Sequence, residues 1–78
     1  MDQKLKQDYN IGKNIRNLRT KKGMTQEQVA AKLQIQGINM SRDFYAHIEC
    51  GTYNIRISEL VALKQILGCE FNDFFEGM

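Results

Sequence analysis

The sequence predicts an all-α protein, a compact bundle of five short helices. Proline is absent from its 78 residues, and no alternation of apolar and polar residues persists as a strand would require. Glycines at positions 12, 23, 37, 51, 68 and 77 divide the chain into short segments. Apolar residues make up 42% of the chain, which is enough for one small core and a single domain.

The first two helices are predicted from apolar spacing and from their ends. An i, i+4, i+7 stripe followed by Lys21-Lys22-Gly23 is typical of a helix that ends in basic residues and glycine, here over residues 10–22. That stripe consists of Ile11, Ile15 and Leu18. Thr25 is placed to cap a second helix that extends to Leu33, and Gln28 completes a capping box. The residues expected to be buried in it are Val29, Ala30 and Leu33.

Three further helices are predicted in the same way. Ser41 is expected to cap a third helix over residues 41–50, which ends at Gly51. Its inner side is expected to carry Tyr45 and Ile48. Ser58 is expected to cap a fourth helix that ends at Gly68. Its apolar stripe consists of Leu60, Leu63, Ile66 and Leu67. A final short turn is expected to fold three aromatic rings over the core: Phe71, Phe74 and Phe75.

Charge is distributed unevenly along the chain. Residues 1–33 contain eight Lys/Arg and three Asp/Glu, a net charge of +5. Residues 34–57 are balanced, and residues 58–78 contain one Lys and four Asp/Glu, a net charge of −3. A basic half and an acidic end are expected when one face of a domain meets a polyanion. A lysine-rich helix face in solvent produces the same pattern.

Several classes of protein are disfavoured. Residues 1–6 contain no apolar run typical of a signal peptide, and no stretch approaches the roughly 20 apolar residues of a membrane span. We therefore expect Cys50 and Cys69 to be reduced thiols in the cytoplasm. His47 has only Asp43 at i−4, which is too few ligands for a metal site. Without a glycine-rich phosphate loop or nucleophile motif, we expect no enzyme activity, no cofactor and no small-molecule substrate.

Four segments carry a family pattern when they are taken in order: Ile11–Arg19, Gly23–Ala30, Ser41–Gly51 and Ile57–Gly68. Together they resemble the Cro/C1-type helix-turn-helix family, also called the XRE family, over about residues 9–76. The resemblance implies a lambda-repressor-like fold whose helix-turn-helix is formed by helices 2 and 3, with residues 1–8 as an N-terminal arm. It also implies sequence-specific binding of double-stranded DNA by a homodimer.

The resemblance places base-reading side chains on the third helix, which would enter the major groove: Ser41, Arg42, Asp43 and His47. Arg42 is suited to paired hydrogen bonds with guanine O6 and N7. Asp43 either accepts from cytosine N4 or orients Arg42, and His47 reaches either a base or a phosphate. Solvated side chains are the alternative for both. Phe44 stands where the family commonly has a small or polar residue, and it either contacts a thymine methyl group or packs against the connection before it.

Phosphate contacts are implied on either side of the third helix. Gln26 lies at the N-terminus of the second helix, where free N–H groups and the helix dipole favour an anion. The loop after Gly51 supplies three more candidates, namely Tyr53, Asn54 and Arg56. Solvated polar side chains are again the alternative. Further non-specific attraction is expected from Lys13, Arg16 and Lys22.

One implied contact is structural. In the resembled family an arginine late in helix 1 pairs with a glutamate at the end of the recognition helix, and Arg19 and Glu49 match those positions. One departure concerns the turn, which has three or four residues in the family. Here residues 34–40 separate Leu33 from Ser41. Because Ile35, Ile38 and Met40 are apolar, this longer connection is expected to pack down onto the domain.

The sequence as a whole predicts a DNA-binding transcriptional regulator, with a repressor favoured over an activator. Its expected place is the cytoplasm of a bacterium, associated with the bacterial or phage nucleoid. The alternative is a small helical protein-interaction module, such as an antitoxin, whose main partner is a protein. Either a partner or a second copy would meet the hydrophobic C-terminus, which contains Phe71, Phe74, Phe75 and Met78.

Overall fold

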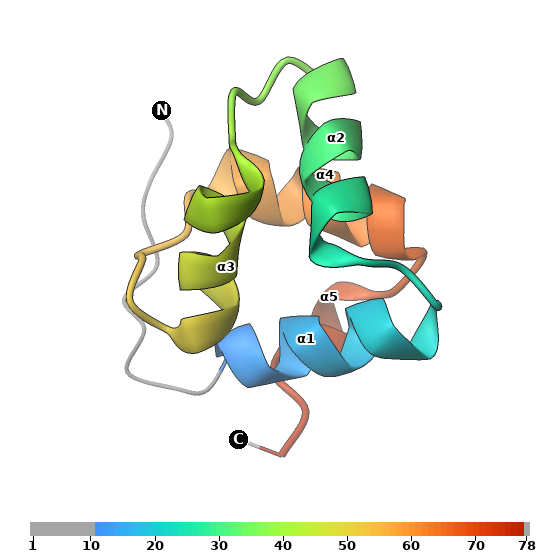
Figure 1. Ribbon diagram of the computed structural model, residues 1–78. Helices are drawn as coiled ribbons and strands as arrows, with labels where there is room; N and C mark the ends of the chain where they lie inside the picture. Colours follow the sequence, from blue (N-terminus) through green and yellow to red (C-terminus); the bar gives the residue numbers. More distant parts are fainter. Residues whose placement is uncertain (1–10, 78) are drawn as a thin grey trace.

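The protein is described by a computed structural model that covers residues 11–77, and in that range the chain forms five helices (Figure 1). These are α1 (Ile11–Lys21), α2 (Gln26–Ile35), α3 (Arg42–Cys50), α4 (Ile57–Leu67) and α5 (Phe71–Phe74). In the view of Figure 1, α2 and α3 stand above α1, and α4 passes behind them. The prediction of an all-α, five-helix domain is confirmed. The expected arm, residues 1–8, lies outside the described residues.

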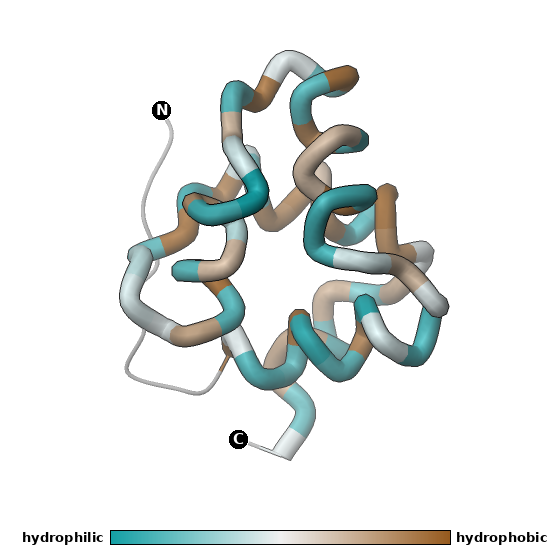
Figure 2. Tube along the Cα trace, in the orientation of Figure 1, coloured by the Kyte–Doolittle hydropathy of each residue, from teal (hydrophilic) through white to brown (hydrophobic). Residues whose placement is uncertain are grey.

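A single apolar core joins all five helices. The prediction of its main stripes is confirmed, since the expected residues of α2 and α4 are buried, as are Ile11 and Ile15 of α1. Leu18 is partly buried against this core. Figure 2 shows that α4 is mostly apolar along its trace, whereas α1 is mostly hydrophilic. Exposed polar residues of α1, α2 and α3 remain at the surface.

The α2 and α3 helices begin at the predicted caps. The Thr25 hydroxyl accepts a hydrogen bond from the Gln28 N–H at 3.1 Å, and the Gln28 side chain accepts from the Thr25 N–H at 2.9 Å. Ser41 Oγ accepts from the Phe44 N–H at 3.1 Å. α3 ends at Gly51, whose φ of 77° is a left-handed conformation that glycine adopts without steric cost. These caps define where the two helices of the motif begin.

The predicted cap of α4 was wrong. The helix begins at Ile57 with Arg56 as its cap residue, two positions before Ser58. The reason is the carboxylate of Glu59, which is buried and accepts a hydrogen bond from the Arg56 N–H at 2.8 Å. This bond satisfies a free donor at the helix start, so the serine hydroxyl is not needed there.

The prediction for the C-terminal aromatic rings was correct for one ring of three. Phe74 is fully buried in the core, whereas Phe71 and Phe75 are exposed. α5 is only one turn long, so one of its aromatic rings can point inward while its neighbours along the turn point outward. The side chain of Asn14 secures this end of the chain by donating to the backbone oxygens of Phe74 and Glu76 at 2.8 and 2.9 Å.

The connection between α2 and α3 packs down, as expected, but not through all of its apolar residues. α2 runs two residues further than predicted, to Ile35, and the side chain of Ile35 is exposed. Met40 is buried and Ile38 is partly buried against the core. Gln34 Nε2 donates to the Met40 backbone oxygen at 2.9 Å. The connection is thus held at both ends, so the start of α3 has a fixed position.

The backbones of α1 and α3 approach each other very closely at Gly12. A Cβ atom added there would lie 2.3 Å from the Ile48 backbone oxygen and 2.7 Å from the Glu49 oxygen. Real side chains do not come so close to backbone atoms, so only glycine permits this contact. The first turn of α1 therefore determines the position of the last turn of α3.

Candidate nucleic-acid interface

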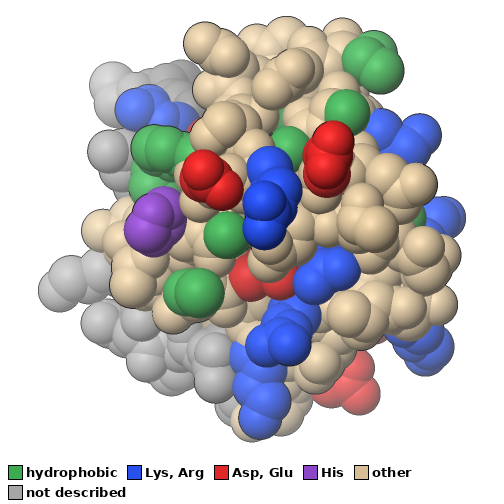
Figure 3. Space-filling view, viewed as in Figure 1, with side chains coloured by type: hydrophobic (Ala, Val, Ile, Leu, Met, Phe, Trp, Pro, Cys, Tyr) green, Lys and Arg blue, Asp and Glu red, His purple; other side chains and the backbone are tan. Residues whose placement is uncertain are grey.

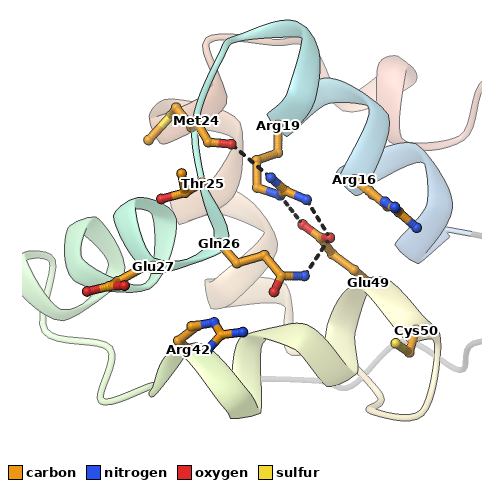
Figure 4. A pocket seen from close by; sticks show the side chains of 9 residues that line it. All are labelled: Arg16, Arg19, Met24, Thr25, Gln26, Glu27, Arg42, Glu49 and Cys50. Atoms are coloured by element: carbon orange, nitrogen blue, oxygen red, sulfur yellow. Dashed lines mark hydrogen bonds and ion pairs between the residues drawn. The ribbon is translucent and has the colours of Figure 1, made fainter.

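Glu49, near the end of α3, accepts hydrogen bonds from side chains of α1, α2 and α3. Figure 4 shows those from Arg19 of α1 and Gln26 of α2. Arg19 Nε and Nη2 donate to its two oxygens at 2.6 and 3.1 Å. Gln26 Nε2 donates to Oε1 at 3.0 Å, and the Tyr45 hydroxyl donates to Oε2 at 2.6 Å. Arg19 also donates to the Met24 backbone oxygen at 2.8 Å. We name the group formed by Arg19, Gln26, Tyr45 and Glu49 the Glu49 cluster.

The ion pair of the Glu49 cluster keeps its charges although Glu49 is buried and Arg19 is partly buried. The Glu49 side chain is 2% exposed and that of Arg19 is 11% exposed. Burial alone would raise the pKa of Glu49, but the hydrogen bonds from Arg19, Tyr45 and Gln26 together lower it below its ordinary value of 4.5. Burial and the bond to Glu49 raise the pKa of Tyr45. Glu49 is therefore an anion that accepts hydrogen bonds from Arg19, Gln26 and Tyr45. These bonds hold α1, α2 and α3 in one arrangement.

A groove of about 550 Å³ opens beside this cluster, between α1, the start of α2 and α3. Arg16, Arg42 and Cys50 line it together with members of the cluster and Glu27. Figure 3 shows basic side chains in a column across this face, with acidic side chains on each side of its upper end. In Figure 4 the amide oxygen of Gln26 points away from Glu49. The groove thus offers several hydrogen-bonding groups that the protein leaves accessible.

The four residues expected to read bases all lie on the exposed side of α3 or at its cap. Arg42 Nη1 is 3.9 Å from Asp43 Oδ1, and these side chains are 61% and 91% exposed. A surface ion pair at that distance contributes little to stability, so the two groups can rearrange around a ligand. His47 Nδ1 lies 2.9 Å from the Thr52 hydroxyl. We name Ser41, Arg42, Asp43 and His47 the reading surface.

The loop after Gly51 is bound to α4. The Tyr53 hydroxyl donates to both Glu59 oxygens at 3.1 Å, and its ring meets that of Phe44 edge to face at a centroid distance of 4.7 Å. Burial raises the pKa of Tyr53. The side chains of Asn54 and Arg56 are exposed. Tyr53 is therefore hydrogen-bonded within the protein, and Asn54 and Arg56 are exposed in the same loop.

A family model described as Helix-turn-helix matches residues 15–74, which span most of the chain. The chain belongs to the Cro/C1-type helix-turn-helix family. This family is one of DNA-binding domains, and such domains are typically not catalytic. Searches of curated proteins and of solved structures return no significant match.

Within this helix-turn-helix domain the structure brings some expected site residues together and separates others. Gln26, Arg19 and Glu49 are in direct contact, although only the last two were expected to meet. In Figure 1 the loop after Gly51 lies on the other side of α3 from the start of α2. Of the three cations expected to add general attraction, Arg16 lines the groove, whereas Lys22 lines different hollows on the surface.

Sequence reasoning missed the hydroxyl of Tyr45. The residue was expected only as an apolar member of the core, but its hydroxyl bonds Glu49 four residues later on the same helix. The i, i+4 spacing of a tyrosine and a glutamate was the signal available. Both cysteines are free, as expected. Among residues 11–77 there is no cluster of three or more potential metal ligands, and no helix long and apolar enough to cross a bilayer.

Proposed function

We propose that this domain is a sequence-specific transcriptional regulator that inserts α3 into the DNA major groove. The observation that carries the proposal is the contrast within one helix: three hydrogen bonds from Arg19 and Gln26 to Glu49 tie α3 to α1 and α2, while Arg42 and Asp43 remain exposed at its start. A helix that is rigidly placed and presents exposed polar side chains fits the docking of a recognition helix. Ser41, Arg42, Asp43 and His47 would contact bases.

Phosphate contacts in this proposal lie on both sides of α3. At the N-terminus of α2, Gln26 offers its backbone N–H and the second hydrogen of its amide, because the first is used by Glu49. On the other side, Tyr53, Asn54 and Arg56 would meet the next stretch of backbone. Repression is the proposed outcome, since a domain bound across a promoter excludes other proteins from it.

A homodimer is also part of the proposal, because one short helix reads few base pairs and two copies double the site. Phe74 is buried and Met78 lies outside the described residues, so the candidates for the dimer surface are the exposed rings of Phe71 and Phe75. These same rings are the observation that favours the rival function, in which the domain binds mainly a partner protein. The two functions differ in their dependence on DNA.

The deciding experiment is a selection of bound duplexes from a random pool, followed by binding measurements at several salt concentrations. We expect the pool to converge on two half-sites about one helical turn apart, and the logarithm of the affinity to fall linearly with the logarithm of salt concentration. A pool without any enriched sequence, together with no retention of DNA at low salt, would contradict the proposal and favour the protein-binding function.

A further inference from the structure

The ring of Phe44 stands on the outer surface of α3 in a fixed orientation. It is 45% exposed, although it belongs to the first turn of the recognition helix, where its N–H is bonded to Ser41 Oγ. An apolar ring left half in solvent has lost part of the hydrophobic stabilisation that burial would give. Because the ring stands beside the reading surface, an apolar group of the bound ligand is the partner that would complete its burial.

Other parts of the protein hold this ring in place. The Phe44 ring meets the ring of Tyr53, in the loop after Gly51, edge to face at 4.7 Å between centroids. The Tyr53 hydroxyl in turn donates to Glu59 on α4. On the same helix, the centroid of the His47 ring lies 6.4 Å from that of Phe44, and these two rings also meet edge to face. Packing between residues of this kind fixes an orientation before any ligand arrives, which lowers the entropic cost of binding. The ring thus packs on Tyr53 of the loop after α3.

We propose that Phe44 is a specificity-determining residue that contacts the C5-methyl group of a pyrimidine in the major groove. This inference rests on the proposed function, since it requires α3 to lie in that groove. Base edges in the major groove present donors, acceptors and one apolar group, which is the methyl of thymine. A 5-methylcytosine carries the same group at the same position of the ring. Phe44 touches His47 and follows Asp43, so polar contacts to neighbouring base pairs would set the register of this methyl contact.

The test removes only the methyl group. In the duplex selected by the wild-type protein, each thymine is replaced in turn by deoxyuridine, and each cytosine in turn by 5-methylcytosine, and affinities are measured by fluorescence anisotropy. We expect each half-site to contain one thymine whose methyl group, when it alone is removed, weakens binding by about four-fold, the effect of burying one methylene-sized group. If instead one cytosine methylation strengthens binding by a similar factor, the methyl comes from 5-methylcytosine, and the inference holds.

Variants then assign the effect to Phe44. In Phe44→Ala the ratio of affinities for the methylated and unmethylated duplexes should fall to about one. Val61→Ala is the matched control, because Val61 is an apolar side chain of similar exposure, 39%, on α4. Its ratio should equal that of the wild type. The circular dichroism spectra of both variants are compared with that of the wild type to check that they are folded.

A second measurement uses the wild-type protein alone. Iodine at C5 of deoxyuridine occupies the place of the methyl group, so irradiation of a duplex carrying it at the sensitive position should crosslink Phe44. The inference is overturned if no position responds to its methyl group, if the response persists in Phe44→Ala, or if the crosslink maps to another residue. In each of those cases a selected DNA site still stands, so the proposed function survives. Failure to select any site would instead overturn the proposed function.

Discussion

The two ends of α3 differ in how much of their hydrogen-bonding capacity the protein itself uses. At the C-terminal end, Glu49 is buried and accepts four hydrogen bonds. At the N-terminal end, Arg42 and Asp43 are exposed and 3.9 Å apart. The first end contributes to folding and sets the position of the helix. The second contributes little to folding, which leaves its side chains available to a ligand. The following substitutions test this division.

The largest effect is expected from Glu49→Ala. This change leaves the buried guanidinium of Arg19 and the hydroxyl of Tyr45 without their acceptor, and breaking a buried ion pair on one side costs about 3–5 kcal/mol. Urea unfolding followed by circular dichroism measures the loss. Asp43→Ala is the control on the same helix, with an expected change below about 1 kcal/mol because that carboxylate is exposed. A loss below about 1 kcal/mol for Glu49→Ala would remove the distinction between the two ends.

Gly12→Ala tests whether the backbone contact between α1 and α3 is as close as described. The new Cβ would collide with the backbone oxygens of Ile48 and Glu49, which cannot turn aside as a side chain can. Overpacking of this kind costs about 3 kcal/mol. Asn17→Ala is the control, since Asn17 is an exposed residue of α1 and alanine favours helix. If thermal unfolding showed the Gly12 variant to be as stable as the wild type, the helices would have to lie further apart.

Much of this comparison was predictable from the sequence, but not all of it. Local signals worked where neighbouring residues decide the outcome, as in the capping box of Thr25 with Gln28. They failed at Ser58, because the start of α4 is set by Glu59, which accepts a hydrogen bond from the Arg56 N–H. The same carboxylate accepts a hydrogen bond from the Tyr53 hydroxyl in the preceding loop. Whether a side chain such as Ile35 is buried depends on which helix lies opposite, and no local pattern contains that information.

The Glu49 cluster shows the same limit. A pair between Arg19 and Glu49 followed from the family resemblance, whereas the bond from Gln26 depends on how α2 meets α3 in space. The expected role of Gln26 as a phosphate contact remains a prediction. Its side chain bonds Glu49 and also lines the groove, so it links the fixed end of α3 to that groove.

Tyr45→Phe should have an intermediate effect. It removes one donor from a buried carboxylate without leaving a cavity, and a hydrogen bond to a charged group contributes about 1.5–3 kcal/mol. We expect a loss of about 1.5 kcal/mol in urea unfolding, since Glu49 keeps its other donors. Tyr53→Phe is the matched control, because its hydroxyl also donates to a glutamate but is less buried. An equal loss in both variants would indicate that burial of the Glu49 cluster adds nothing to this bond.

The charge of Glu49 predicts a dependence of stability on pH. Its pKa is lowered in the folded protein from an ordinary value of 4.5, so the stabilisation is complete above that value. It is lost as the pH falls through the lower pKa of the folded state, by at most about 1.4 kcal/mol for each pH unit. Unfolding free energies measured between pH 7 and pH 2 should therefore fall less steeply in Glu49→Gln than in the wild type. Parallel curves would mean that folding does not lower the pKa of Glu49.

The smallest effect on stability, and a large one on DNA, is expected from Arg42→Ala. Its side chain is exposed and weakly paired, so the unfolding free energy should change by less than about 0.5 kcal/mol. If Arg42 reads a guanine, discrimination at one base pair should drop by about 1–3 kcal/mol while weak general binding survives. Affinity for the selected duplex and for point-substituted duplexes measures this. Gln26→Ala provides the contrast, because loss of a phosphate contact weakens every sequence alike. A uniform loss for Arg42→Ala would make Arg42 a phosphate contact as well, and base reading would then fall to the remaining side chains of the exposed end of α3.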